Sequence, residues 1–158
     1  MTHHIIDTHV HIWDLQRAEY AWLKNDTSIL NQTYSIDQLS PQLSKAGVTG
    51  GVLVQAANNL EDTDLMLEAA AGTSWLKGVV GWLPLTSPRE SEKALAERYL
   101  EDSYFKGCRH LIHNEGDPRW LLQDKVMESL RLLAAHHLPY DVVGVSPEHL
   151  ETAIRVAE

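Results

Sequence analysis

Hydrophobic and polar positions along this chain follow two patterns that alternate five times. In each repeat a short apolar segment rich in β-branched residues comes before a stretch in which apolar residues recur at helical spacing. Near-continuous apolar segments are typical of parallel strands that are covered by helices. The predicted strands are residues 5–12, 51–57, 76–85, 105–112 and 138–145.

Capping signals place the predicted helices between these strands. Ser35 is the expected N-cap of the first helix, Gln38 completes a capping box, and Gly47 follows the expected last turn. Glu61 and Asp62 put negative charge in the first turn of the second helix. The dipeptide Ser-Pro at residues 87–88 and 146–147 puts proline at the first position of two more helices. The expected helices are residues 36–45, 60–71, 88–100, 123–136 and 147–154.

Five strand–helix repeats predict an α/β fold with parallel strands and right-handed crossovers. An open doubly wound sheet and a (β/α)8 barrel both satisfy this pattern. The first strand lacks the glycine-rich loop of dinucleotide-binding sheets, which favours the barrel of the TIM type. Such a barrel needs roughly 250 residues. We therefore expect residues 1–158 to form a single domain, the N-terminal portion of a barrel truncated after about five units.

Composition narrows the class of protein. The chain has 13 Lys and Arg against 22 Asp and Glu, and its formal charge of −9 leaves no basic surface for nucleic acid or an anionic membrane. No apolar segment approaches the roughly 20 residues that span a bilayer, and no signal peptide is evident. The single cysteine, Cys108, fits a reducing compartment and is most simply a small core residue. We expect a cytoplasmic protein without nucleic-acid or membrane partners.

Candidate chemistry is concentrated at the end of the first predicted strand. His9 and His11 are two residues apart, so in a strand both imidazoles project to one side, with Asp7 behind them on the same face. In a helix the same spacing would turn the two side chains about 200° apart. Two imidazoles on one face can hold a single divalent metal or a polar substrate. The structural alternative is a pair of satisfied polar residues at a strand end.

A second polar group ends the fourth predicted strand. Alternation places Arg109 and His113 on one face and His110 on the other, which favours a structural role for His110. An arginine at a strand end can clamp a carboxylate or a developing oxyanion, so Arg109 and His113 are candidates for substrate contact. The alternative for Arg109 is a surface ion pair with Glu115 or Asp117.

Three more side chains are candidates for substrate contact. Gln55 and Trp82 end the second and third predicted strands and can line a pocket, although Trp82 fits the core equally well. Asp141 lies among apolar neighbours and needs a partner, as a ligand, a base or a member of an ion pair. The long segment 15–33 is expected to cap the pocket. Its aromatic residues, Tyr20 and Trp22 among them, either stack on a sugar or ring or hold the loop to the barrel.

Several segments resemble the amidohydrolase superfamily, in the lactonase-like branch that includes sugar-acid lactonases and the hydrolase of pyrone dicarboxylate. The histidine segment 6–14 is shared by the whole superfamily. Gly-x-Arg-His at residues 107–110 and Asp-Pro-x-Trp-Leu at residues 117–121 are narrower motifs. The resemblance covers nearly the whole chain, and the other matching segments are residues 54–57, 80–85 and 138–141.

This resemblance implies the N-terminal portion of a TIM-barrel hydrolase, which opens a cyclic ester of a sugar acid or small carboxylic acid by attack of water, typically in carbohydrate or aromatic-acid catabolism. It implies that His9 and His11 lie at the floor of the site and that Arg109 contacts the lactone substrate. It further implies one divalent metal, zinc first, held by His9 and His11 and activating the water. Some members of this branch work without a metal.

Two segments of the family pattern have no counterpart here. An Asp-His-x-Gly-Lys-Pro-like segment on strand six and a catalytic Asp on strand eight are both absent from the 158 residues. The chain alone is therefore expected to be inactive or nearly so. Two other functions remain: a metal-dependent decarboxylase or C–N hydrolase on the same fold, and a noncatalytic half-barrel that forms a homo-oligomer through its open edges.

Overall fold

The computed structural model describes residues 4–158. Its centre is one sheet of five parallel strands, and each strand pairs with the next strand along the chain. This sequential order is that of a barrel, because a doubly wound sheet reverses its strand order at a switch point. The strands are β1 (Ile5–Val10), β2 (Val48–Val54), β3 (Leu76–Gly81), β4 (Phe105–His110) and β5 (Tyr140–Val142).

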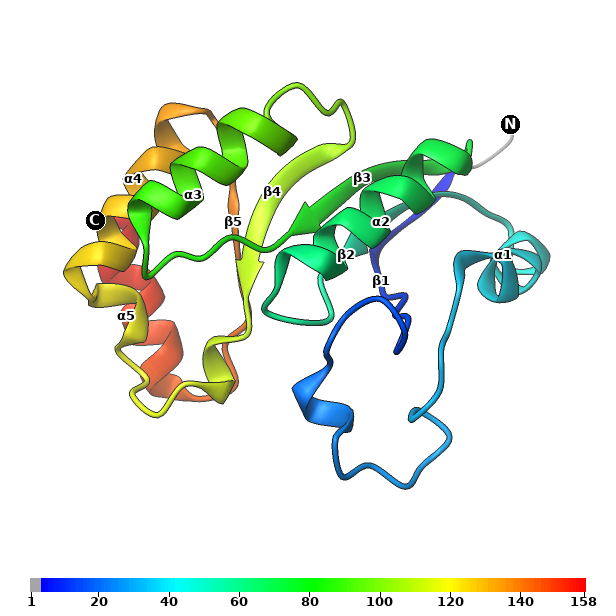
Figure 1. The fold of residues 1–158 in the computed structure, drawn as a ribbon, viewed down its shortest axis with the longest axis horizontal. Coiled ribbons are helices and arrows are strands. Elements are labelled where there is room, and N and C mark those ends of the chain that lie inside the picture. The colour runs from blue at the N-terminus through cyan, green and yellow to red at the C-terminus, as the bar shows by residue number, and fades with distance from the viewer. Residues whose placement is uncertain (1–3) are drawn as a thin grey trace.

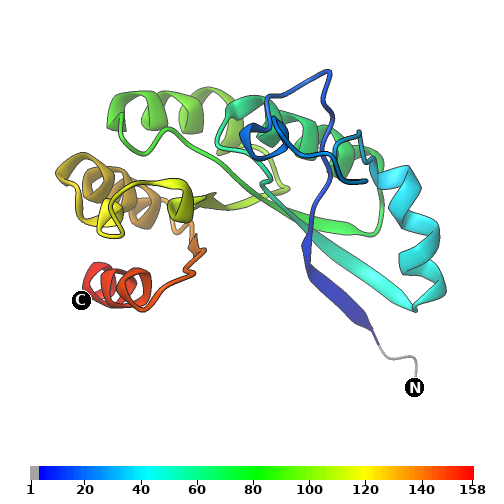
Figure 2. The same ribbon diagram turned by 90° about the horizontal axis from the view of Figure 1, so that it is seen from below.

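The sheet curls into a half-barrel with the helices around it (Figures 1 and 2). The strand–helix alternation predicted from the sequence is confirmed. The helices are α1 (Ile36–Lys45), α2 (Leu60–Gly72), α3 (Pro88–Ala94), which continues as a π-helical turn over Leu95–Tyr99, α4 (Asp124–Ala135) and α5 (Pro147–Ala157). Within residues 4–158, no helix combines the length and the apolar character needed to cross a membrane.

The element boundaries differ from prediction mainly where the strands end. Each predicted strand extends two to four residues too far toward its carboxyl end. After β1, β3 and β4, apolar residues such as Ile12, Leu83 and Ile112 are buried without pairing in the sheet, so an apolar pattern alone overstates strand length. The helix signals around α1 are confirmed, since Gln38 Oε1 accepts from the Ser35 amide at 2.9 Å. Gly47 follows the helix with a φ of +78°, a left-handed conformation that favours glycine.

The hydrophobic core lies between the sheet and the helices. Leu53 from β2 and Met66 from α2 are fully buried, and the ring of Tyr99 stacks on Phe105 with centroids 5.0 Å apart. Cys108 is also fully buried, and burial raises the pKa of its thiol to about 12. It is therefore an inert core residue, as the sequence predicts.

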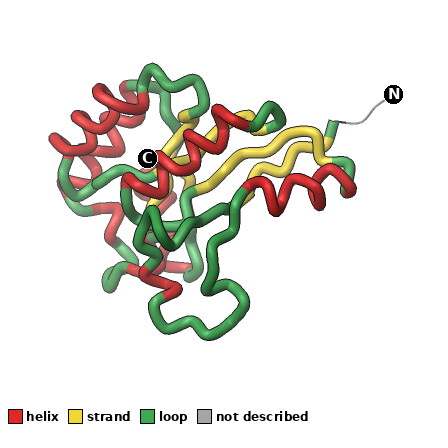
Figure 3. Tube along the Cα trace, turned by 45° about the vertical axis from the view of Figure 1, so that its right-hand side comes forward, coloured by secondary structure: helices red, strands yellow, loops and turns green. Residues whose placement is uncertain are grey.

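A long loop connects β1 to α1 and projects from the carboxyl end of the sheet (Figure 3). It contains one short 3-10 helix, η1 (Ala21–Leu23). Tyr20 and Leu23 are buried against the two alanines that follow β2. The Tyr20 hydroxyl donates to Asp62 Oδ1 in α2 at 2.8 Å. The loop is thus pinned to the β2–α2 turn, which supports the interpretation of Tyr20 as an anchor.

Candidate active site

The carboxyl ends of β1 and β4 bring together three residues that the sequence singled out. The Nε2 atoms of His9 and His11 lie 3.0 Å apart, and Arg109 Nη1 lies 3.0 Å from His9 Nε2. The imidazole rings meet edge to face, with centroids 4.8 Å apart. β1 ends at Val10, yet both histidines still project to the same side. Curvature of the sheet therefore joins side chains that are 100 positions apart in the chain.

Hydrogen bonds assign the lone pairs of the two imidazoles. His11 Nδ1 lies 2.8 Å from the carbonyl oxygen of Val54 and must donate to it, so Nε2 of the neutral ring carries a lone pair. Burial lowers the pKa of His11, and the nearby His9 and Arg109 lower it further. Arg109 can only donate, so His9 Nε2 also accepts. The two Nε2 lone pairs lie 3.0 Å apart with no proton between them, so a cation that replaces the Arg109 hydrogen bond at His9 could bind both nitrogens.

The donor set of this pair fits two positions of a metal site. The carbonyl of Val54 fixes the ring and tautomer of His11, which is what outer hydrogen-bond partners do for metal-binding histidines. Two zinc–nitrogen bonds of about 2.0–2.1 Å each can span the nitrogen separation. Among residues 4–158, no group of three or more His, Cys, Asp or Glu could hold a metal ion. The chain thus supplies a pair of ligands rather than a complete set.

Arg109 is buried, with 7% of its surface exposed. Its Nε atom has no hydrogen-bond partner in the described chain. The Asp141 carboxylate on β5 lies 3.9 Å from Nε, which is within reach for an ion pair but too long for a hydrogen bond. Burial lowers the pKa of Arg109, and Asp141 opposes this shift. The guanidinium therefore keeps an unused donor in a desolvated position, and Asp141 has the partner that the sequence required.

The surface ion pair suggested for Arg109 does not form. Glu115 Oε1 lies 2.7 Å from His110 Nε2, and Asp117 Oδ1 lies 3.3 Å from Arg119 Nε. Both carboxylates are thus engaged elsewhere, and that interpretation is wrong. The reason is the curl of the sheet, which turns Arg109 inward toward His9.

His110 has the structural surroundings that alternation predicted for it. Its Nδ1 accepts from the Trp82 indole at 2.9 Å, and its ring stacks on Trp120 with centroids 4.0 Å apart. Contrary to expectation, Trp82 is not brought to the cavity beside Arg109; it lines a separate cavity over α2 and α3. Its N–H donates to His110, and its half-buried side chain lies at the wall of that other cavity.

A cavity of about 400 Å³ opens beside the histidine–arginine cluster. We call it the site cavity. Its volume lies within the range of ligand pockets. Trp22 from the β1–α1 loop forms part of the wall, as expected for a capping loop. The lining residues are His11, Trp13, Trp22, Gln55, Ala56, Arg109, Leu111, His113 and Asn114.

Four candidates from the sequence therefore line the site cavity, namely His11, Gln55, Arg109 and His113. His113 is exposed in the short 3-10 helix η3 (Ile112–Asn114) that follows β4. Gln55 is fully buried, and its Nε2 donates to Asn58 Oδ1 at 3.0 Å. Its Oε1 is buried without a partner in the described chain. A buried acceptor left unpaired at a cavity wall can accept from a ligand hydroxyl.

Two polar residues that the sequence patterns did not single out organise this end of the sheet. Asn58 Oδ1 accepts from the Leu111 amide at 3.0 Å and so ties the segments after β2 and β4 together. Asp62 is fully buried and accepts from the amides of Ala56 and Ala57 at 2.8 and 3.2 Å. Asp62 therefore does more than place negative charge in the first turn of α2, because it also holds the turn after β2. A signal existed: Asp62 precedes the buried Met66 by four positions, on the same helix face.

Histidine burial predicts that acid destabilises the fold. Burial is the main cause that lowers the pKa of His11 and His110 below the ordinary 6.5. The unfolded chain therefore binds more protons than the folded chain as the pH falls. The stability that neutral histidines contribute is present above pH 6.5 and is lost as the pH falls through the lower folded-state pKa values.

We accordingly expect the urea midpoint to fall as the pH is lowered from about 7 to about 5. The His110→Gln variant should lose part of this pH dependence. His136→Gln, which alters an exposed histidine at the end of α4, serves as the matched control and should keep it. An identical pH slope in both variants would contradict the assignment to His110.

The curled sheet of parallel strands in sequential order defines a β/α-barrel fold, in which the paired histidines at the end of the first strand lie beside an arginine of the fourth. The amidohydrolase family model matches residues 6–158. The chain belongs to the amidohydrolase family.

Known relatives are about twice as long as this chain. L-fucono-1,5-lactonase of Burkholderia ambifaria is 30% identical over 153 residues, which cover 96% of this chain and 51% of that protein. The crystal structure of a Burkholderia multivorans amidohydrolase with bound HEPES has a TM-score of 0.84 at 25% identity and covers 98% of this chain and 54% of that one. Its zinc-bound crystal form has a TM-score of 0.82 at 27% identity, covering 98% and 55%. The chain spans about half the length of the curated relatives it matches.

Proposed function

We propose that this chain carries part of a lactonase site, which opens cyclic esters of sugar acids or small carboxylic acids with water. The observation that carries the proposal is the buried Arg109, which contacts His9 at the wall of the site cavity and keeps an unused donor. The 30% identity to a protein named as a lactonase supports the ester class of substrate over the decarboxylase and C–N hydrolase alternative.

In this proposal Arg109 binds the lactone carbonyl. Attack of water turns that oxygen into an oxyanion, and a fixed guanidinium in a desolvated cavity stabilises the charge as it develops. When no metal is bound, the neutral His11 orients the attacking water through its Nε2 lone pair. The water oxygen bonds to the carbonyl carbon, the ring C–O bond breaks, and the ring oxygen takes the proton that the water releases. Gln55 Oε1 accepts from a substrate hydroxyl, and His113 lies at the cavity rim.

His9 and His11 would hold the divalent metal that the family implies. When bound, such an ion polarises the carbonyl and lowers the pKa of the attacking water. Further ligands would have to come from outside residues 4–158, because no group of three or more possible ligands lies within them.

The untagged chain is expected to bind zinc through this pair. His9→Asn or His11→Asn should raise the zinc dissociation constant at least about tenfold, measured by competition with a chromophoric chelator. The double variant His136→Asn, His137→Asn removes two exposed adjacent imidazoles and should bind zinc as the unaltered chain does. Equal affinities in all these proteins would contradict a metal at His9 and His11.

Complementation tests the lactonase proposal. The chain is mixed with the C-terminal half of the B. ambifaria lactonase, and aldonolactone hydrolysis is followed with a pH indicator. We expect little or no turnover from the chain alone and turnover from the mixture, because the chain supplies only part of the site. A stable complex that does not hydrolyse any lactone in the series would overturn the proposal.

A second candidate function is a noncatalytic half-barrel that self-associates. Ile5 and Ile6 on the edge strand β1 are 48% and 54% exposed, and Val145 beyond the other edge is 70% exposed. Exposed apolar edge strands favour pairing with another chain. Light scattering of the purified chain decides: a dimer that blocks complementation favours this function, and a monomer excludes it.

A further inference from the structure

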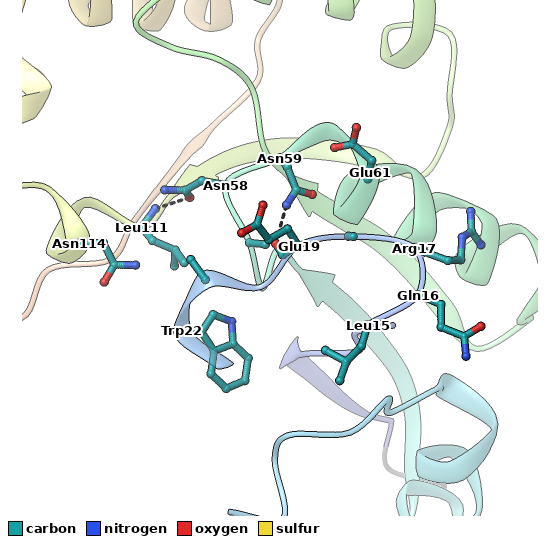
Figure 4. A pocket seen from close by; sticks show the side chains of 13 residues that line it. Leu15, Gln16, Arg17, Glu19, Trp22, Asn58, Asn59, Glu61, Leu111 and Asn114 are labelled. Carbon is teal, nitrogen blue, oxygen red and sulfur yellow. Dashed lines mark hydrogen bonds between the residues drawn. The ribbon is translucent and has the colours of Figure 1, made fainter. Parts of the chain in front are cut away.

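A second and larger cavity, of about 790 Å³, lies beside the site cavity at the same end of the sheet (Figure 4). We call it the side groove. Its walls are the β1–α1 loop, the turn between β2 and α2, and the segment after β4. Trp22, Leu111 and Asn114 line both cavities. A ligand held in the site cavity can therefore extend past these residues into the side groove.

Hydrogen bonds hold the walls of the side groove in place. Asn59 Nδ2 donates to the carbonyl oxygen of Glu19 at 2.8 Å, which fixes the β1–α1 loop against the start of α2 (Figure 4). Asn58 Oδ1 accepts from the Leu111 amide on the other side. The Trp22 indole donates to the carbonyl oxygen of Ala56 at 2.9 Å. The groove is therefore preformed, which lowers the entropy lost on binding.

Several polar side chains of the side groove make no hydrogen bond within residues 4–158, and two of them carry negative charge. Arg17 makes two hydrogen bonds to Glu68, at 2.6 and 2.9 Å, so its charge is neutralised. The remaining charged side chains of the side groove are two carboxylates, which repel an anionic ligand. The site cavity differs, because it contains the cationic Arg109. The groove side chains that make no hydrogen bond within residues 4–158 are Gln16, Glu19, Glu61 and Asn114.

We propose that the side groove binds a neutral sugar ring attached to the lactone in the site cavity. This inference rests on the proposed function, because it assigns the second part of the same substrate. Side-chain amides both donate to and accept from sugar hydroxyls, and ionised carboxylates accept from them. Trp22, 39% exposed, offers an apolar ring face to the C–H side of a pyranose. The substrate class is a lactone with a neutral glycosyl substituent, held by Arg109 at one end and by the groove at the other.

Calorimetric titration of the 158-residue chain tests the side groove without any turnover. The probes are cellobiose, a neutral disaccharide, and gluconate, an anionic single sugar acid. Cellobiose is expected to bind saturably, and Trp22→Leu should weaken its binding at least about tenfold. Because Trp22 also anchors the loop, Asn114→Ala is a second variant and should weaken cellobiose severalfold while leaving the circular dichroism unchanged.

Charge variants make the test specific. The double variant Glu19→Gln, Glu61→Gln should tighten gluconate binding about three- to fivefold, with a smaller change in cellobiose binding because the amides of Gln still bond sugar hydroxyls. The matched control Glu92→Gln, Glu101→Gln removes two exposed carboxylates outside the groove and should change neither. The inference is overturned if cellobiose gives no saturable signal or if neither Trp22→Leu nor Asn114→Ala weakens cellobiose binding. If the chain binds cellobiose but the complemented barrel does not hydrolyse lactones, the sugar-binding side groove stands and only the lactonase proposal is refuted.

Discussion

Replacement of Arg109 by Met is expected to lower kcat/KM for lactone hydrolysis by the complemented barrel about 10²–10³-fold. The guanidinium is the one cation that contacts the imidazole pair within the described chain, and in the proposed function it binds the lactone carbonyl. Removal of a fixed donor to an oxyanion acts on the transition state, so the loss should appear in kcat rather than in KM alone.

The same substitution should not lower stability. Arg109 is buried with an unpartnered Nε and a carboxylate no closer than 3.9 Å to that atom, so its burial is poorly compensated. A Met of similar length fills the space without this penalty, and the melting temperature should stay the same or rise. Arg119→Met, which removes an exposed arginine paired with Asp117, is the matched control and should retain activity. A fall of activity and melting temperature together would show a structural rather than a catalytic role.

Replacement of Asp62 by Ala is expected to lower the free energy of unfolding by about 3–5 kcal/mol. The carboxylate accepts from the Tyr20 hydroxyl and from the amides of Ala56 and Ala57, and all three donors are buried. Each donor left unpaired in the interior costs about 1–3 kcal/mol. Urea denaturation followed by circular dichroism measures the change.

Two variants separate the parts of this effect. Tyr20→Phe removes only the loop contact and should cost about 1 kcal/mol, with faster proteolysis of the β1–α1 loop. Glu61→Ala, an exposed neighbour that makes no hydrogen bond in the described chain, is the control and should change stability by less than about 0.5 kcal/mol. If Asp62→Ala were as mild as Glu61→Ala, the buried carboxylate would not hold the turn after β2.

Strand–helix alternation and the shared face of His9 and His11 were predictable because both follow from local periodicity. Alternation along an extended chain has a period of two, so any strand across residues 9–11 puts the two imidazoles on one side. Ser35, Gln38 and Gly47 likewise act within a few residues of one another, which is why the limits of α1 agree with prediction.

The partners of polar side chains were less predictable, because the alternatives lie far apart in the sequence. For Arg109 the nearby Glu115 and Asp117 were plausible partners, whereas the real contacts are His9 on β1 and Asp141 on β5. Trp82 follows the same strand-end rule as Gln55, but its indole meets His110 instead of the site cavity. No local sequence pattern predicts the direction in which a side chain points once the strand has ended.

By itself the sequence determined an α/β chain of five parallel units and a histidine pair on one face of its first strand, since these depend on spacing and on residue type. Only the tertiary structure decided that the sheet curls with its strands in sequential order, that Arg109 turns inward to His9, and that Asp62 is buried beneath Tyr20. These contacts depend on sheet curvature and loop packing. Both result from many small interaction energies spread over distant residues, so no short sequence segment predicts them.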